Sequence, residues 1–210
     1  DKKLDIEINI ALYDHLPAVI LEVIYKNVSA NEINVKSVEA LRVLKAEAGS
    51  LFYPHVLKCL TNGAMYYDAG TIHTFGNPYQ KPEPYGETKG GVMLNNSLSA
   101  NNETVQSWWN VGLFRGYDQE SIALGYIENR SGLGRLQLLK TDAGQLSLIV
   151  ESVYNPGFVL KPGQVISSDR FMINIAENPY QALENYASMV GKIHHSAAST
   201  PVNGWCNWFY

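Results

Sequence analysis

The sequence predicts a mainly β protein, an antiparallel β-sandwich with one C-terminal linker helix. Three observations support this prediction. Apolar and polar residues alternate in short runs, as they do in half-buried strands. Turn residues such as Asn62-Gly63 and Lys161-Pro162-Gly163 separate the runs. No helical pattern lies between the runs, so a parallel α/β sheet is not expected.

The composition is that of a folded chain without affinity for nucleic acid. The 210 residues include 20 acidic and 16 basic ones, which gives a net charge of −4, so no nucleic-acid partner is expected. Hydrophobic residues make up 46% of the chain, enough to bury a core. No apolar run approaches the roughly 18 residues that cross a bilayer, and no membrane partner is expected. Cys59 and Cys206 lie far apart and match no metal or redox spacing, so no disulfide framework is expected to hold the fold. Neither a metal nor a cofactor is expected.

The first predicted strands lie at the N-terminal end. Residues 4–12 alternate apolar and polar side chains, which indicates a half-buried strand. Residues 18–26 and 33–43 are rich in β-branched side chains on one face, and a short polar segment separates them. We therefore predict that these two runs pair as an antiparallel hairpin.

Further strands follow along the chain. The candidates are residues 56–60, 71–75, 107–114, 121–127, 135–140, 146–153 and 165–175. Trp108 and Trp109 fall within one of them, so their rings are expected on opposite faces. Asn155-Pro156-Gly157 indicates a turn. Residues 76–91 contain three Pro and four Gly, which predicts a long exposed loop.

One helix is predicted near the C-terminal end. Asn178 can cap it, Pro179 suits its first position, and Gly191 can end it. Its expected apolar face consists of Tyr180, Leu183, Tyr186, Ala187 and Val190. Four aromatic residues follow within residues 201–210, which indicates the first strand of a further domain. We therefore divide the chain into a sandwich domain over residues 1–176, a helix and linker over 177–200, and this strand over 201–210.

Two C-terminal segments resemble a known family. Residues 184–191 read ENYASMVG, and residues 204–210 read GWCNWFY. Together they resemble the junction in α-galactosidases of glycoside hydrolase family 36. There a large N-terminal β-supersandwich ends in a helix of the form Y-A-x-x-V/G, and the first strand of the catalytic barrel reads G-W-C-S-W-Y. This sequence departs from that pattern at Asn207, where the family has Ser, and at Phe209, where it has Tyr.

Weaker similarities lie upstream. Residues 125–127 (GYI) resemble the family's G-F-L strand, and residues 61–67 (TNGAMYY) resemble its N-x-W-Q-S-W loop with both Trp lost. The resemblance spans about residues 56–210, and its last thirty residues are the specific part. A catalytic (β/α)8 barrel of about 250 residues does not fit into this chain beside a sandwich, so the chain would hold only the barrel's first strand.

The resemblance implies a retaining exo-glycosidase that removes terminal α-galactosyl residues with two Asp carboxylates. Both carboxylates would lie beyond Tyr210, so no catalytic residue is expected in this chain, which alone should be inactive. The implied substrate-binding residues are Trp208 and Phe209, at the wall of the sugar pocket, and less firmly Tyr67. The implied partners are an α-galactoside or oligosaccharide substrate and the chain's own C-terminal barrel domain, and homo-oligomerisation is left open.

The residues themselves leave other interpretations open. Asp5 and Glu7 share the polar face of a strand, and Asp118 and Glu120 lie at a hairpin tip; exposed structural roles are favoured for both pairs. His194-His195 is better explained as a solvated linker than as a metal site. Plain barrel packing explains Trp208 and Phe209 equally well.

Two functional alternatives remain. One is a free-standing carbohydrate-binding β-sandwich module, which would hold a glycan on exposed aromatic rings. The other is an enzyme of the same clan that acts on α-N-acetylgalactosaminides or transfers galactosyl groups as raffinose-type enzymes do.

Overall fold

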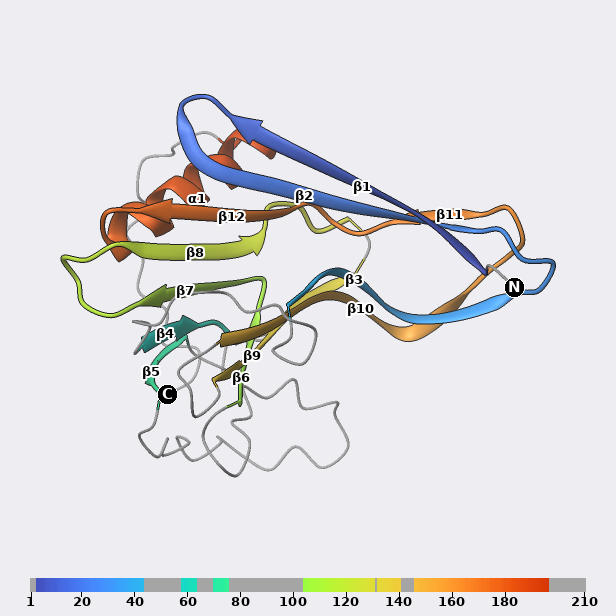
Figure 1. Ribbon diagram of the computed structural model, residues 1–210, viewed down its shortest axis with the longest axis horizontal. Helices are drawn as coiled ribbons and strands as arrows, with labels where there is room; N and C mark the ends of the chain where they lie inside the picture. The colour runs from blue at the N-terminus through green and yellow to red at the C-terminus, as the bar shows by residue number, and fades with distance from the viewer. Residues whose placement is uncertain are drawn as a thin grey trace, which may run out of the picture.

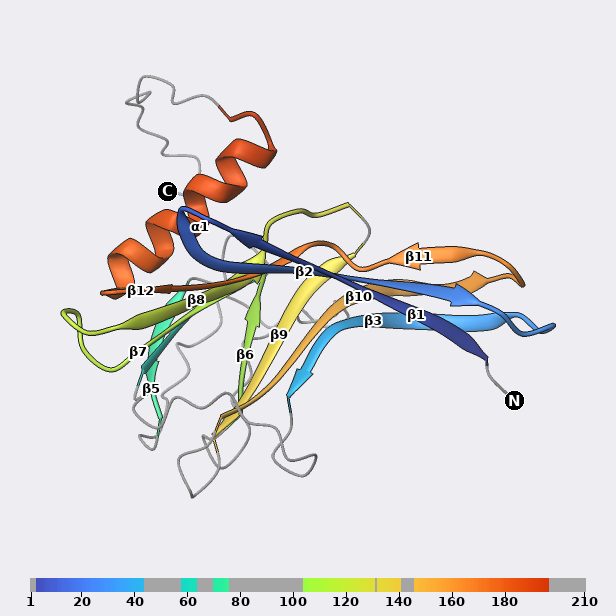
Figure 2. The ribbon, with the colours of Figure 1, turned by 45° about the horizontal axis from the view of Figure 1, so that its top comes forward.

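The computed structural model describes residues 3–43, 58–63, 70–75, 104–130, 132–140 and 146–196. Over these residues the chain forms three layers, a helix, a large sheet and a small sheet (Figures 1 and 2). The elements are β1 (Leu4–Tyr13), β2 (Leu16–Asn27), β3 (Ile33–Val43), β4 (Lys58–Thr61), β5 (Thr71–Thr74), β6 (Thr104–Trp108), β7 (Asn110–Phe114), β8 (Ser121–Tyr126), β9 (Leu133–Lys140), β10 (Leu146–Leu160), β11 (Val165–Ser167), β12 (Phe171–Ala176) and α1 (Pro179–Ile193).

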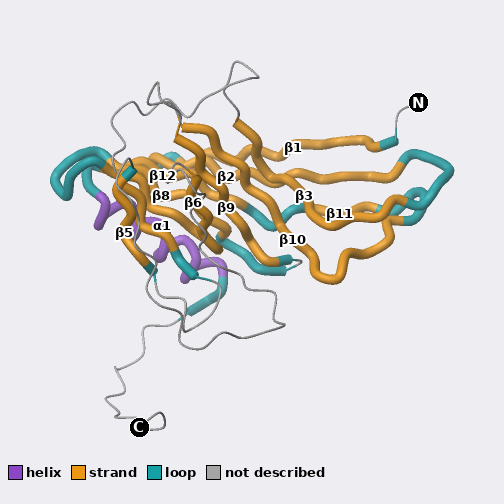
Figure 3. Tube along the Cα trace, turned by 90° about the horizontal axis from the view of Figure 1, so that it is seen from below, coloured by secondary structure: helices purple, strands orange, loops and turns teal. Residues whose placement is uncertain are grey.

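Both sheets are antiparallel, which confirms the predicted β-sandwich. The large sheet has the order β1-β2-β12-β8-β7-β4-β5, with β11 also paired to β2, and the small sheet has the order β3-β10-β9-β6. Figure 3 shows that strands dominate the described chain, with α1 at the end of the molecule away from the N-terminus. No helix among the described residues is long and apolar enough to cross a membrane.

The main core lies between the two sheets. Its buried side chains come from both, and they include Leu113, Leu124 and Phe171 of the large sheet and Leu136 and Leu148 of the small one, all with 0% exposure. Phe171 also meets the ring of Tyr126 edge to face, with centroids 5.5 Å apart. Alternating strand positions thus supply the core, as the sequence pattern predicts.

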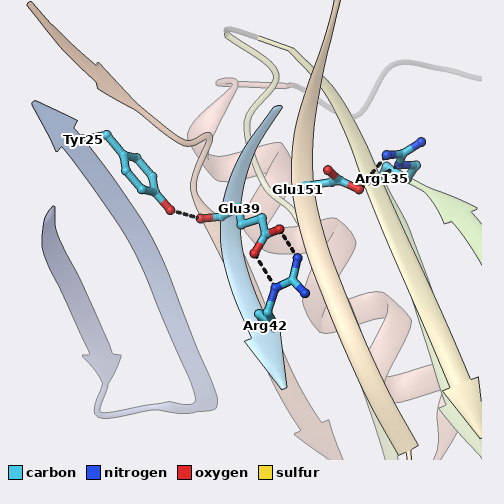
Figure 4. Close-up of polar contacts among 5 residues, drawn as sticks. All are labelled: Tyr25, Glu39, Arg42, Arg135 and Glu151. Carbon is cyan, nitrogen blue, oxygen red and sulfur yellow. Dashed lines mark hydrogen bonds and ion pairs between the residues drawn. The ribbon is translucent and has the colours of Figure 1, made fainter. Parts of the chain in front are cut away.

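Polar contacts tie the sheets and strands at their margins (Figure 4). The hydroxyl of Tyr25 on β2 donates a hydrogen bond to the backbone carbonyl of Glu39 on β3, which bridges the two sheets. The Glu39 carboxylate pairs with Arg42 on its own strand. Within the small sheet, Arg135 pairs with the buried carboxylate of Glu151 at 2.7 Å. Of these carboxylates only that of Glu151 is buried, and Arg135 compensates its charge.

The predicted hairpin of residues 18–26 and 33–43 is wrong. These runs form β2 and β3, which belong to different sheets, and β3 pairs with β10 instead. The Asn27 side chain holds the crossing, because its amide donates to the carbonyls of Asn31 (2.8 Å) and Leu160 (2.9 Å). A polar connection of this length can either close a hairpin or pass from one sheet to the other. The buried Asn27 stabilises the connection between the two sheets.

The predicted single strand over residues 107–114 is also wrong. The chain forms β6 in the small sheet and β7 in the large sheet, and Trp109 between them adopts φ 68°. This left-handed backbone turns the chain from one layer to the other. Its cost, on the order of 1–3 kcal/mol, is offset by hydrogen bonds from Trp109 N to Gly134 O (2.9 Å) and from Tyr126 N to Trp109 O (2.8 Å).

Two further predicted boundaries differ in the structure. Asn155-Pro156-Gly157 is not a turn, because β10 continues through it with an irregular register between Val153 and Phe158. Residues 165–175 form two strands, β11 and β12. The break holds two buried polar side chains: the Ser168 hydroxyl accepts from Val23 N, and the Asp169 carboxylate accepts from Arg130 N. The predicted loop over residues 76–91 lies outside the described residues.

Candidate functional site

The helix α1 packs on the outer face of the large sheet, against β8, β12 and β7. The predicted cap is confirmed: the Asn178 side chain accepts from Gln181 N at 2.9 Å, and Pro179 begins the helix. The helix continues past Gly191 to Ile193. Among the described residues, α1 is the last element before the segment that resembles a barrel strand.

The buried face of α1 differs from the predicted one. Ala182, Tyr186 and Met189 are buried against Ile20, Ala123 and Met172 of the sheet and form a second core. Two of the residues assigned to the apolar face, Tyr180 and Ala187, are exposed instead. The apolar face is therefore rotated from the predicted one, and Tyr180 is left 62% exposed to solvent.

Tyr186 fixes the helix to the sheet through a position that only glycine can occupy. Its ring lies over Gly125 on β8, where an added Cβ would come within 2.7 Å of the ring and 2.6 Å of the Asn110 Cβ on β7. Its hydroxyl donates to the carbonyl of Tyr126. Burial raises the pKa of Tyr186 to about 12, so the phenol stays protonated and keeps this donor.

A polar groove lies beside the N-terminal end of α1, where the β7–β8 turn approaches it. We call it the Tyr117–Tyr180 groove. Its volume is about 720 Å³, and its lining includes Tyr117, Asp118, Glu177, Tyr180, Gln181 and Glu184. The volume falls within the range of small-molecule sites.

Two stacked rings form the aromatic part of the groove. Tyr117 and Tyr180 have centroids 6.1 Å apart and an interplanar angle of 25°, and both are half or more exposed. Phe114 supports Tyr117 from the sheet side at 5.7 Å, and the Lys58 ammonium lies 5.2 Å from the Tyr117 ring centroid. The support from Phe114 and Lys58 holds the Tyr117 ring in place while leaving it partly open to solvent.

The groove contains groups of the kinds that can contact a sugar. The apolar face of a sugar ring stacks on an aromatic ring, carboxylates accept hydrogen bonds from its hydroxyls, and amides both accept and donate them. Asp118, Glu184 and Gln181 supply those groups around the tyrosines. Asp118 and Glu120 are both exposed, as the sequence predicts for a hairpin tip.

A charged network joins the end of β8 to the start of β12. Glu128 pairs with both Arg170 and Arg130, and Arg130 also reaches Glu22 at 3.5 Å. The hydrogen bond from Arg170 holds the pKa of Glu128 below its ordinary value. The network brings three strands together and has a structural role.

Other reactive groups are buried or have structural contacts. Cys59 is fully buried, and burial raises its pKa to about 12, which makes it a poor nucleophile. Burial also lowers the pKa of His73, whose ring lies 2.8 Å from the Thr61 hydroxyl. His194 caps α1, and its ring contacts the carbonyl of Ile127 at 3.1 Å. Among the described residues, no three His, Cys, Asp or Glu side chains gather as metal ligands do.

The predicted substrate-binding residues Trp208, Phe209 and Tyr67 all lie outside the described residues, as does the predicted strand over residues 201–210. Sequence reasoning missed the two tyrosines of the groove, because helical spacing alone placed Tyr180 on the buried face. The turn residues around Tyr117 gave no indication that a second aromatic ring would stack on it.

Comparison with solved structures relates this fold to known enzymes. The galactosidase domain of an α-galactosidase–sucrose kinase superposes on 88% of this chain with a TM-score of 0.59 and 10% sequence identity. The family 36 α-galactosidase AgaA from Geobacillus stearothermophilus, solved with stachyose, covers 89% with a TM-score of 0.56 and 8% identity. The fold is one found in family 36 α-galactosidases.

The similarity is one of structure and covers part of each enzyme. The α-galactosidase from Lactobacillus brevis also covers 90% of this chain, with a TM-score of 0.53 and 7% identity. The chain spans only 23% to 24% of the length of these three proteins. No family model matches the sequence, and no curated protein matches it either.

Proposed function

We propose that this chain is the N-terminal, non-catalytic part of an α-galactosidase-like retaining glycoside hydrolase that acts on terminal α-galactosides. Its role is to support a C-terminal (β/α)8 barrel and to supply one wall of the sugar pocket. The barrel would contribute both catalytic carboxylates, which lie about 5 to 5.5 Å apart in retaining enzymes.

One observation carries this proposal: 88% to 89% of this chain superposes on 23% to 24% of the chains of two α-galactosidase structures. A fold by itself does not determine activity. The position of α1 adds support, because it directly precedes the segment that resembles the first barrel strand, residues 204–210. Gly125 and Tyr186 fix that helix to the sandwich, so the junction begins from a rigid base.

The pocket wall is tested by the variant Trp208→Ala in the full-length protein, extended past Tyr210. We expect kcat/KM for an aryl α-galactoside to fall by about tenfold to a hundredfold, or about 1.4 to 2.8 kcal/mol, because stacking area and exclusion of water are both lost. Steady-state kinetics and a thermal melt of the same sample measure the effect.

Trp205→Ala is the matched control, since Trp205 lies three residues nearer the start of the same predicted strand. We expect it to lower the free energy of unfolding by roughly 3 to 5 kcal/mol as a core truncation. If Trp208→Ala keeps the wild-type kcat/KM and only lowers the melting temperature, Trp208 is a packing residue and the pocket assignment is wrong.

A second candidate function is carbohydrate binding by the sandwich itself. The Tyr117–Tyr180 groove favours it, because two exposed rings lie beside carboxylate and amide groups. Such binding requires no barrel and no catalytic carboxylate. It is compatible with an α-galactosidase as the full-length protein, in which the groove would hold a part of the glycan away from the reacting bond.

The variant Tyr180→Ala tests this second function. We expect the 210-residue chain to bind raffinose weakly, and the variant to bind it about tenfold more weakly, because one stacking face is removed. Titration calorimetry measures both. Tyr13→Ala, which truncates a tyrosine that is 43% exposed at the end of β1, is the control and should bind as the wild type does. If raffinose does not bind, or binds equally to Tyr180→Ala, the groove is not a site for this class of sugar.

The other two enzyme activities left open by the sequence would use the same fold. An α-N-acetylgalactosaminidase or a raffinose-type galactosyltransferase would differ from an α-galactosidase in the barrel's pocket residues. The sequence beyond Tyr210 and an assay against the matching substrates separate the three activities.

A further inference from the structure

The edge strand β1 exposes a row of large apolar side chains. Ile6, Ile8, Ile10 and Leu12 are 56%, 60%, 65% and 75% exposed. We call these four residues the β1 stripe. They alternate with the polar or small residues Asp5, Glu7, Asn9 and Ala11. Solvent-exposed apolar rows of this kind mark interaction surfaces.

The β1 stripe lies on the core-facing side of the large sheet. In the register of β1 and β2, Ile6 is opposite Tyr25 and Ile8 is opposite Val23, and opposed residues of an antiparallel pair share a face. Tyr25 reaches Glu39 of the small sheet, so its face points toward that sheet. The β1 stripe therefore continues the core-facing side of the large sheet from β2 onto β1, where the side chains are exposed to solvent.

The edge of β1 has little of the usual protection against another strand. It is an end strand of the large sheet over the described residues, and its segment LDIEINIALY contains no Pro, Gly, Lys or Arg; its two charges are Asp5 and Glu7. Its register with β2 is regular from Leu4 to Leu12, so this stretch carries no bulge that would bend it away. The other end of the described large sheet is β5, with only four residues. Natural edge strands are normally shortened, charged or kinked, because unpaired backbone groups recruit a further strand.

We propose that β1 pairs antiparallel with β1 of a second copy of this chain, across a two-fold axis. Such a contact is self-complementary, and it continues the large sheet from one copy into the other. To keep both stripes on one face, the axis must pass through a residue and not between two. The charges and the length of the regular stretch together decide which residue is at the centre.

The carboxylates exclude two central positions, Glu7 and Ile6. If the axis passed through Glu7, this residue would face its own copy, and if it passed through Ile6, Asp5 would face Glu7. Like charges directly opposite each other destabilise a sheet. With Ile8 at the centre, Glu7 faces Asn9 instead.

The same register keeps the rest of the strand matched. Asp5 faces Ala11, Ile6 faces Ile10, and Leu4 faces Leu12, so apolar side chains pair with apolar ones. Centres at Asn9 or Ile10 would also keep the carboxylates apart, but Ile8 is the middle residue of the regular stretch from Leu4 to Leu12, so it alone brings all of that stretch into the contact. A second copy meets these conditions by symmetry, whereas an unrelated strand would have to match the same spacing of charges.

Sedimentation velocity of the 210-residue chain over a range of concentrations tests the proposal. We expect a monomer–dimer equilibrium, and we expect Ile8→Lys to raise its dissociation constant at least tenfold, because two ammonium groups would face each other at the axis. Ile72→Lys is the matched control: Ile72 is a 47% exposed isoleucine on β5, the opposite edge strand, and its variant should dimerise as the wild type does.

A cross-linking experiment tests the register without relying on a charged variant. In a Cys206→Ser background, Ile8→Cys should form an intermolecular disulfide on treatment with oxidised glutathione, whereas Leu12→Cys, which faces Leu4 of the partner, should not. The remaining Cys59 is fully buried. A wild-type chain that stays monomeric at all concentrations, or a dimer that neither responds to Ile8→Lys nor cross-links through Ile8→Cys, overturns the proposal.

Discussion

The Gly125→Ala variant is expected to lose about 2–4 kcal/mol of unfolding free energy and to loosen α1 from the sheet. The new Cβ would lie 2.6 Å from the Asn110 Cβ and 2.7 Å from the Tyr186 ring. Asn110 cannot move easily, because its Cβ is fixed to a paired strand, so the ring must shift. Overpacking costs about 1–3 kcal/mol. Loss of the hydrogen bond from Tyr186 to the Tyr126 carbonyl lowers the free energy of unfolding by about 1 kcal/mol more.

The control for this variant is Gly191→Ala. Gly191 lies in the same helix, but an added Cβ would have no heavy atom within 4 Å. Alanine favours the helix over glycine, so this variant should gain up to about 1 kcal/mol. Urea unfolding followed by circular dichroism gives both values. Equal stabilities for Gly125→Ala and the wild type would show that α1 is not held through this contact.

Much of the fold follows from local sequence patterns. The alternation over residues 4–12 places β1 within one residue of its observed bounds, although the strand is exposed and not half-buried as predicted. Asn178-Pro179 locates the start of α1. These patterns succeed because a strand's period of two and a helix cap are properties of short segments. The mainly β class followed from the same evidence.

The pairing of strands required information that short segments do not contain. Nothing in residues 27–32 distinguishes a hairpin from a crossing between layers, and the buried amide of Asn27 decides between them only through Leu160, 133 residues away. The break at Trp109 was missed because a tryptophan at φ 68° goes against local preference and is held by Gly134 and Tyr126 from other strands. Long-range contacts of this kind override propensity.

The candidate site shows the same limit more strongly. The sequence indicated aromatic residues, but the pairing of Tyr117 with Tyr180 depends on how a strand turn meets a helix start. The helix rotation that exposes Tyr180 is set by Gly125 and Tyr186, which decide how the helix fits on the sheet. The spacing of apolar residues along the helix cannot predict how the helix packs on the sheet. Trp208, Phe209 and Tyr67 remain predictions from the resemblance.

The largest expected difference in activity is between the 210-residue chain and the full-length protein with its barrel. Retaining hydrolysis requires a nucleophile and an acid/base carboxylate held together at the sugar, and the proposal places both beyond Tyr210. The 210-residue chain should therefore hydrolyse an aryl α-galactoside no faster than buffer does, while the full-length protein should turn it over at the ordinary rates of enzymes, about 1 to 1,000 per second.

The measurement that tests the central claim most directly is the rate of aryl α-galactoside hydrolysis by these two proteins, purified side by side. The account predicts turnover by the full-length protein alone. Turnover by the 210-residue chain that is lost in Asp118→Ala or Glu120→Ala would contradict it, because the catalytic carboxylates would then lie in the sandwich. A full-length protein without activity toward any α-galactoside would contradict the proposed enzyme class.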